Sequence, residues 1–131
     1  MASSQSERVR EGIALFNRGE FFECHEVLES VWLEASGEDK TFLQGLIQVA
    51  VSFYHLRRSN YTGAGRLLRA GIDKLSGCTA SPHPVDLRAV DIGAIDIGDL
   101  LGRLHSLLEQ IEAGRAQPET SAPEIRLLSV S

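Results

Sequence analysis

Apolar residues recur every three or four positions over most of the chain, a spacing that places them on one face of an α-helix. This pattern predicts five helices, at residues 5–17, 20–35, 40–58, 60–75 and 96–114. Between the fourth and fifth helices, glycine, proline and aspartate residues interrupt the pattern, so we expect a connector there. The sequence contains no β-hairpin signature and no glycine-rich phosphate loop. The predicted fold class is therefore all-α, a compact bundle of about five helices arranged as helical hairpins.

The third predicted helix, residues 40–58, is expected to be the central buried helix of the bundle. Residues 41–56 contain no aspartate, glutamate, lysine or arginine and are hydrophobic around most of the helix circumference. The connections to the neighbouring helices are short, which favours antiparallel packing on both sides.

Polar and small residues mark the starts of two helices. Ser36 is followed three positions later by Asp39, a spacing that resembles a capping box, and Asn60 is expected to cap the fourth helix. Gly63 and Gly65 lower the stability of that helix, so we expect another backbone to approach closely near its start.

The C-terminal part of the chain lacks a sustained period. We expect a single helical domain at residues 1–114 and a flexible tail at residues 115–131. Alternatively, the apolar tail residues Ile125, Leu127 and Leu128 dock on the helical domain or on a partner. A homo-oligomer formed through this tail or through the apolar stripe of the last helix is also consistent with the sequence.

Length and composition are those of one ordinary globular domain. The chain has 131 residues, of which 43% are hydrophobic, and no stretch approaches the ~18 consecutive apolar residues of a membrane span. The first twelve residues hold no apolar segment of the signal-peptide type, so we expect a cytoplasmic protein without a membrane partner. Cys24 and Cys78 lie far apart and form no CxxC pair, which argues against a disulfide framework or a cysteine zinc site.

Charge is segregated along the chain. The net charge is −5, yet residues 40–75 hold six basic and one acidic side chain. Arg57, Arg58, Arg66 and Arg69 lie in this segment and could attract an anion or a phosphate backbone. The acidic overall balance and the scarcity of aromatic residues among these arginines argue against nucleic acid as a partner. A solvated cationic face is the preferred interpretation.

Polar residues interrupt the apolar faces of the second and third helices. On a helical projection, His25 and Glu29 fall on or beside the buried face of the second helix. Gln44, Gln48 and His55 form one stripe on the third helix. If the two helices pack antiparallel, these stripes meet in an interior polar cluster, in which the candidate members are His25, Glu26, Glu29, Gln44, Gln48, His55 and Asn60.

This cluster supports more than one kind of chemistry. The sequence HExxE at residues 25–29 places an imidazole and a carboxylate one turn apart, close enough to bind one metal ion. The second histidine of the HExxH metalloprotease motif is missing, because Glu29 stands at its position. The remaining metal hypothesis is one divalent metal ion held by His25, Glu29 and His55. The structural alternative is a hydrogen-bonded network that sets the register of the helices.

Two functions follow from these alternatives. The preferred one is a binding or scaffold module for a protein or small-molecule partner, because no complete catalytic set is visible. The alternative is a metal-assisted or acid–base enzyme, such as a hydrolase, with Glu26 or Glu29 as the catalytic base and the two histidines as ligands or proton carriers. Cys24 is expected to be an inert core residue, and Trp32 and Tyr54 to be core anchors rather than ligand platforms.

Three segments resemble the family known as domain of unknown function 309: FNRGEFFECHEVLESVW (Phe16–Trp32), FLQGLIQVAVSFYH (Phe42–His55) and NYTGAGRLLRAGIDKL (Asn60–Leu75). From the first to the last, they span about half of the chain and contain all seven candidate members of the polar cluster. The resemblance implies a small all-α bundle of helical hairpins. It brings no assigned activity, so it supports the fold more than the function.

Overall fold

The computed structural model describes residues 5–77, 83–84 and 94–128, and these residues form five α-helices. The helices are α1 (Gln5–Asn17), α2 (Phe21–Trp32), α3 (Gly37–Arg57), α4 (Tyr61–Ser76) and α5 (Ile97–Glu112). The predicted all-α class is confirmed. Among the described residues, no helix has the length and apolar character needed to cross a membrane.

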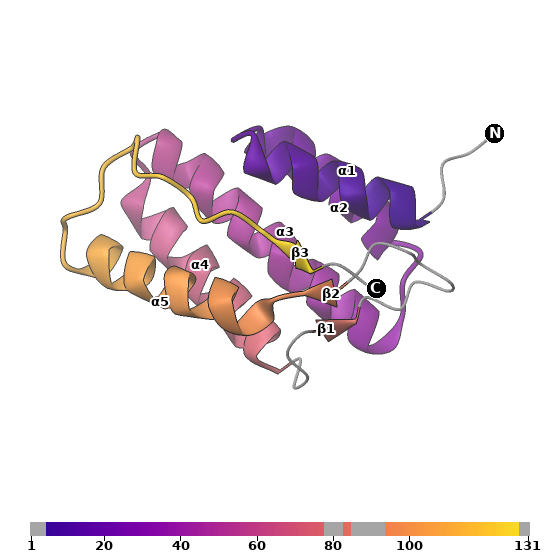
Figure 1. Cartoon of the computed structure of the whole chain (residues 1–131). Helices are drawn as coiled ribbons and strands as arrows, with labels where there is room; N and C mark the ends of the chain where they lie inside the picture. Colours follow the sequence, from indigo (N-terminus) through magenta and orange to yellow (C-terminus); the bar gives the residue numbers. More distant parts are fainter. Residues whose placement is uncertain (1–4, 78–82, 85–93, 129–131) are drawn as a thin grey trace.

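Helix α3 is the centre of the bundle, as predicted. It packs against α2 on one side and α4 on the other, while α1 packs on α2 and α5 packs on α4 (Figure 1). The buried residues of α3 lie around most of its circumference, which explains why the segment lacks charged side chains: Phe42, Leu43, Gly45, Leu46, Val49, Ala50, Ser52, Phe53 and Leu56.

Three phenylalanines join α1, α2 and α3 at one end of the bundle. The ring centroid of Phe21 lies 5.2 Å from that of Phe16 and 5.3 Å from that of Phe53, and Phe16 and Phe53 are 5.7 Å apart. All three side chains are buried. Aromatic pairs at these distances contribute about 0.5–1.5 kcal/mol each beyond their buried area. The cluster therefore fixes the start of α2 against α3.

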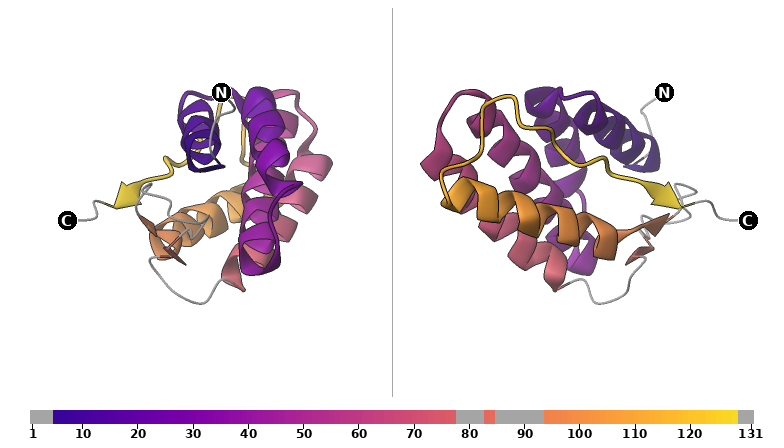
Figure 2. Two further views of the ribbon diagram at one scale, coloured as in Figure 1. Left: turned by 90° about the vertical axis from the view of Figure 1, so that its right-hand side faces the viewer. Right: turned by 60° about the vertical axis from the view of Figure 1, so that its left-hand side comes forward.

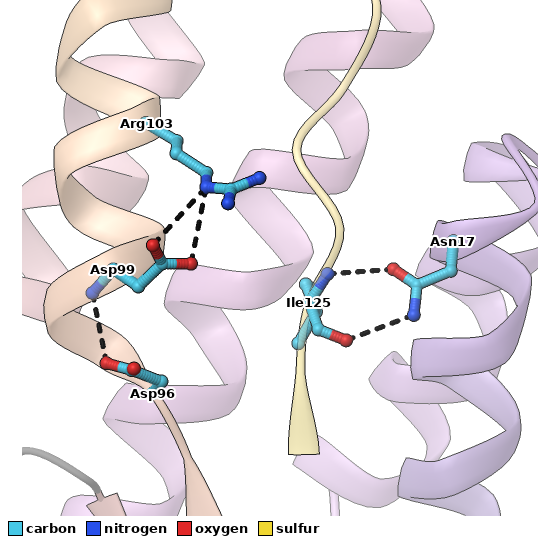
Figure 3. A network of polar contacts seen from close by, with 5 residues as sticks. All are labelled: Asn17, Asp96, Asp99, Arg103 and Ile125. Atoms are coloured by element: carbon cyan, nitrogen blue, oxygen red, sulfur yellow. Dashed lines mark hydrogen bonds and ion pairs between the residues drawn. The ribbon is translucent and has the colours of Figure 1, made fainter. Parts of the chain in front are cut away.

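The two expected caps behave differently. The Asn60 side chain accepts a hydrogen bond from the Gly63 N–H at 3.0 Å, so the predicted cap of α4 is confirmed. Ser36 occupies the N-cap position of α3 with an extended backbone, but its side chain makes no capping hydrogen bond. The prediction that the Ser36 side chain caps this helix was therefore wrong. Asp96 caps α5 by accepting from the Asp99 N–H at 3.0 Å (Figure 3).

The close backbone approach involves α4, but at a different glycine from those predicted. A Cβ atom at Gly63 would meet the Asn60 side chain, and one at Gly65 would meet a side chain of α5 at 3.5 Å. A Cβ atom at Gly71, in contrast, would lie 2.9 Å from the backbone oxygen of Gly45. Helices α3 and α4 therefore touch through their backbones in the second half of α4.

Short strands lie where the sequence predicted only a connector and a tail. They are β1 (His83–Pro84), β2 (Ala94–Ile95) and β3 (Leu127–Leu128), paired antiparallel in the order β1-β2-β3. Each strand has two residues, too few to produce a period of two in the sequence. Residues 78–82 and 85–93 of the predicted connector lie outside the described residues.

The segment after α5 runs back along the bundle between α1 and α5 (Figures 1 and 2). Within it Ala116 and Ile125 are buried, so its described part is docked on the body and is not a free tail. Residues 129–131 lie outside the described residues, and the domain boundary at residue 114 stays a prediction. The apolar stripe of α5 is buried inside the chain, where α5 packs on α4.

The contact between Gly45 and Gly71 gives a prediction for stability. Gly71→Ala should lower the free energy of unfolding by about 1–3 kcal/mol, because the added methyl group has no room between Gly45 and Val49. Gly102→Ala is the matched control in α5, where a Cβ atom meets nothing within 4 Å, and it should raise stability by about 0.5–1 kcal/mol. Urea denaturation followed by circular dichroism measures both. Equal effects of the two substitutions would contradict the close approach.

Candidate functional site

The histidines of α2 and α3 meet at one cavity between these helices. The cavity has a volume of about 120 Å³ and is lined by Phe21, Phe22, His25, Val51, Tyr54 and His55. Each helix contributes three residues spaced over one turn, so a single face of each helix forms the walls. His25 and His55, which the sequence analysis placed in one cluster, thus line the same cavity.

His25 is held by a neighbour on its own helix. Its Nε2 atom lies 2.9 Å from Oε2 of Glu29, one turn further along α2. The imidazole therefore donates from Nε2, and Nδ1 is the acceptor when the ring is neutral. The two side chains are 27% and 50% exposed, so solvent screens this pair. Glu29 orients His25 but does not itself line the cavity.

His55 is held by the residue that caps α4. The Asn60 Nδ2 donates a hydrogen bond to Nδ1 of His55 at 3.2 Å, while its Oδ1 accepts from the Gly63 N–H. Because the cap sets which end of the amide faces the ring, Nδ1 of His55 is the acceptor and Nε2 carries the proton. One side chain thus begins a helix and orients an imidazole.

Aromatic rings surround the histidines. The ring centroid of Phe22 lies 5.6 Å from that of His25 and 5.7 Å from that of Tyr54, and the Tyr54 centroid lies 5.9 Å from that of His55. Phe22 is 45% exposed, so an apolar ring at the cavity reaches the solvent. Tyr54, expected to be a core anchor, is partly buried and lines the cavity. Trp32 is also partly buried and packs against the core.

The predicted polar cluster is not interior. Among the described residues, Ser52 is the buried polar side chain, whereas His25 and His55 are half-buried and Glu26 is exposed. Gln44 and Gln48 are half-buried on α3 and do not line the cavity. The helical projection placed these side chains too deep: among the described residues α2 packs mainly on α1 and α3, and this packing leaves His25 half-buried and Glu26 exposed.

The metal hypothesis finds no support in this geometry. In the part of the chain that the structure describes, no group of three or more His, Cys, Asp or Glu side chains is arranged to hold a metal ion. His25 and His55 each use one ring nitrogen for a neighbour, Glu29 and Asn60 respectively. The trio His25, Glu29 and His55 therefore does not form a binding group.

Most of the arginines considered for anion binding have partners within the chain. The guanidinium of Arg58 lies 5.4 Å from the ring centroid of Tyr54, and Arg69 forms an ion pair with Glu112. Arg57 donates hydrogen bonds to backbone carbonyls of the C-terminal segment. The cationic segment is thus used largely for intramolecular contacts.

Comparison with known proteins finds similarity to one family and to two curated relatives. Residues 9–67 match the family described as "Domain of unknown function (DUF309)". The match covers a little less than half of the chain. The resemblance expected from the sequence is confirmed, and the matched stretch contains every residue that lines the cavity.

Two relatives are similar to a larger part of the chain than the family match covers. The "Uncharacterized protein YpuF" of Bacillus subtilis (strain 168) is 38% identical over 105 residues, which are 79% of this chain and 56% of that protein. An "Uncharacterized protein" of Aquifex aeolicus (strain VF5) is 27% identical over 94 residues, 71% of this chain and 27% of that protein. The chain therefore spans about half the length of the first relative and about a quarter of the second.

Four residues that line the cavity were not among the sequence-predicted site residues. They are Phe21, Phe22, Val51 and Tyr54, the last of which was expected to be a core anchor. Phe22 carried a usable signal, because this large apolar residue lies one turn before the acidic Glu26 on the predicted helix. A large apolar residue in such a position is a candidate for ligand or partner contact.

Cys24 is inert, as predicted. Its side chain is fully buried, and burial raises the pKa of its thiol from the ordinary value of 9.0 to about 12, although a hydrogen bond with the backbone of Phe16 opposes the shift. The thiolate required for nucleophilic chemistry is therefore absent near neutral pH.

The raised pKa of Cys24 has a measurable consequence. The pKa of the Cys24 thiol is higher in the folded state than in the unfolded state. The stability that the protonated thiol contributes is therefore present below pH 9.0 and is lost as the pH rises toward 12. Two variants are compared, Cys78→Ser alone and Cys78→Ser with Cys24→Ala. Above pH 9 the free energy of unfolding should fall more steeply in the variant that keeps Cys24. The difference between the two slopes should reach up to about 1.4 kcal/mol per pH unit. Urea denaturation at several pH values measures the difference, and parallel curves would contradict the assignment.

Proposed function

We propose that the chain is a cytoplasmic binding module whose cavity between α2 and α3 receives one apolar side chain of a protein partner. The observation that carries this proposal is the aromatic cavity itself, together with the exposure of Phe22 at its wall. Soluble proteins usually cover large apolar rings, and an exposed ring beside a preformed hollow is typical of a recognition site.

The size of the cavity suits a single side chain. Its volume of about 120 Å³ is somewhat smaller than the ~150 Å³ of an engineered apolar cavity that binds benzene. An aliphatic or aromatic side chain that fills such a site contributes about 1.5–3 kcal/mol through burial. The two oriented imidazoles add hydrogen-bonding groups to a wall that is otherwise apolar or aromatic.

The charge on α2 indicates the surroundings of that side chain in the partner. Glu23 and Glu26 are exposed on the same helix as Phe22, and neither forms an ion pair with another described residue. An apolar anchor flanked by basic residues complements this surface, because exposed carboxylates guide a cationic partner toward the cavity.

Toluene is a direct probe of the proposed cavity. Titration of the full chain with toluene should shift the NMR signals of Phe22, Tyr54, His25 and His55, because the ring of toluene occupies the space of a partner side chain. Val51→Phe should reduce these shifts at least five-fold, since a phenyl group at that position fills the cavity. Unchanged spectra at saturating toluene, or equal shifts in the Val51→Phe variant, would contradict the proposal.

A matched pair of substitutions separates the cavity from general surface hydrophobicity. Phe22 in α2 is 45% exposed, and Leu33 at the C-cap of α2 is 67% exposed. Of these two apolar residues, only Phe22 lines the cavity. Phe22→Ala should weaken toluene binding, whereas Leu33→Ala should leave it unchanged. Equal losses would indicate non-specific binding.

The second candidate function is an acid–base enzyme, with His25 as the base that Glu29 orients. The 2.9 Å contact between these side chains supports it, because a carboxylate that holds an imidazole is a common arrangement in catalysis. The described residues that line the cavity speak against it, since they include no serine, threonine, cysteine or carboxylate.

Ester hydrolysis distinguishes the two functions. The binding proposal predicts that the wild-type chain and its Glu29→Gln variant hydrolyse p-nitrophenyl acetate at equal rates, close to that of free imidazole at the same concentration. General acid–base catalysis contributes about 10²–10⁴-fold in enzymes, so a wild-type rate at least ten-fold above that of the variant would favour the enzyme.

A further inference from the structure

Among the described residues, the side-chain hydrogen bonds that the helices make to the C-terminal segment go to its main chain. The Nη1 atom of Arg57 donates hydrogen bonds to the backbone oxygens of Pro118 and Thr120, each at 2.7 Å. Further along, β3 pairs with β2 through backbone hydrogen bonds. Contacts of this kind recognise an extended peptide and depend little on its side chains.

Asn17 makes the clearest of these contacts. Its Nδ2 donates to the backbone oxygen of Ile125 at 3.0 Å, and its Oδ1 accepts from the N–H of the same residue at 2.8 Å (Figure 3). A side-chain amide thus satisfies both backbone groups of one residue, as a neighbouring strand would. Figure 3 shows the segment running in extended form past the end of α1 at this point.

The segment does not fill the groove in which it lies. A cavity of about 390 Å³ is bounded by Phe16, Phe21 and Arg57 on the helices and by residues 121–124 of the segment. A second, of about 520 Å³, lies along α1 beside Ile125. Between the buried residues Ala116 and Ile125, the side chains of Gln117, Glu119, Ser121 and Glu124 are exposed. One branched aliphatic side chain, Ile125, is therefore the main apolar anchor.

We propose that this groove, formed by α1, the α1–α2 corner and Arg57, is a binding site for an extended peptide segment of a partner protein. Residues 116–125 of the chain occupy it as a built-in ligand. The partner segment is extended and carries an aliphatic side chain at the position of Ile125, with the backbone N–H and C=O of that residue free to pair with Asn17. This site is separate from the cavity between α2 and α3.

A partner peptide must compete with the built-in ligand for the groove. A tethered segment has a local concentration in the millimolar range, so it lowers the apparent affinity of any peptide added in solution. Removing the built-in ligand from the groove should therefore reveal the binding of a peptide that the intact chain binds weakly.

A labelled peptide tests this directly. The probe is a fluorescein-labelled peptide of residues 115–128, RAQPETSAPEIRLL, added to the full-length chain and to its Ile125→Asp variant. The carboxylate at position 125 displaces the built-in ligand from its buried site, while Asn17 and Arg57 stay intact. Fluorescence anisotropy should show binding at least ten-fold tighter to the variant than to the wild-type chain.

Two controls define the specificity. A peptide that carries the same Ile125→Asp change, and the double variant Ile125→Asp with Asn17→Ala, should each bind at least ten-fold more weakly. Equal binding to wild-type and Ile125→Asp chains, or equal binding of the two peptides, would overturn the proposal. A wild-type dimer that dissociates in the Ile125→Asp variant would also overturn it, because the occupant would then be the segment of a second copy.

Hydrogen exchange in the wild-type chain gives an answer even if Ile125→Asp fails to fold. If the segment is a displaceable ligand, the Ile125 amide should exchange at least a hundred-fold faster than the amide of Val49 in α3. If both amides exchange at the rate of global unfolding, the segment is part of the cooperative fold and the proposal fails.

Discussion

The contact of Phe21 with Phe16 and Phe53 is the interaction on which the rest of the molecule depends. It fixes the first turn of α2 against α1 and α3. Phe21 also lines the cavity between α2 and α3, and it lines the cavity beside the C-terminal segment. Because one buried ring supports both surfaces, the packing that stabilises the fold also sets the positions of the groups that a partner would meet.

The sequence predicted the helices and the central position of α3 because these follow from the distribution of charge and apolar residues. It also predicted that His25 and His55 would meet, since antiparallel packing brings their stripes together. It could not predict how deep they lie. A helical projection gives the direction of each side chain, but the exposure of His25 depends on which elements cover α2, and that is a property of the tertiary structure.

Other features had no signal in the pattern. The pairing of Asn17 with Ile125 joins residues that are 108 positions apart and uses a side chain on one side and the backbone on the other, so no periodicity reports it. The sequence predicted a close backbone approach for α4 but placed it near Gly63 and Gly65, whereas the structure has it at Gly71. Composition shows that a helix contains small residues, but it does not show which of them faces the neighbouring backbone. Asn60 was recognised as a cap, whereas its contact with His55 depends on the turn between α3 and α4.

The two surfaces are physically connected through Arg57. Its guanidinium lies 5.3 Å from the ring centroid of Phe21 and also donates to the carbonyls of the C-terminal segment. Phe21 lines both the cavity between α2 and α3 and the cavity beside the segment. Arg57, the last residue of α3, therefore contacts both the segment in the groove and a ring that belongs to both surfaces.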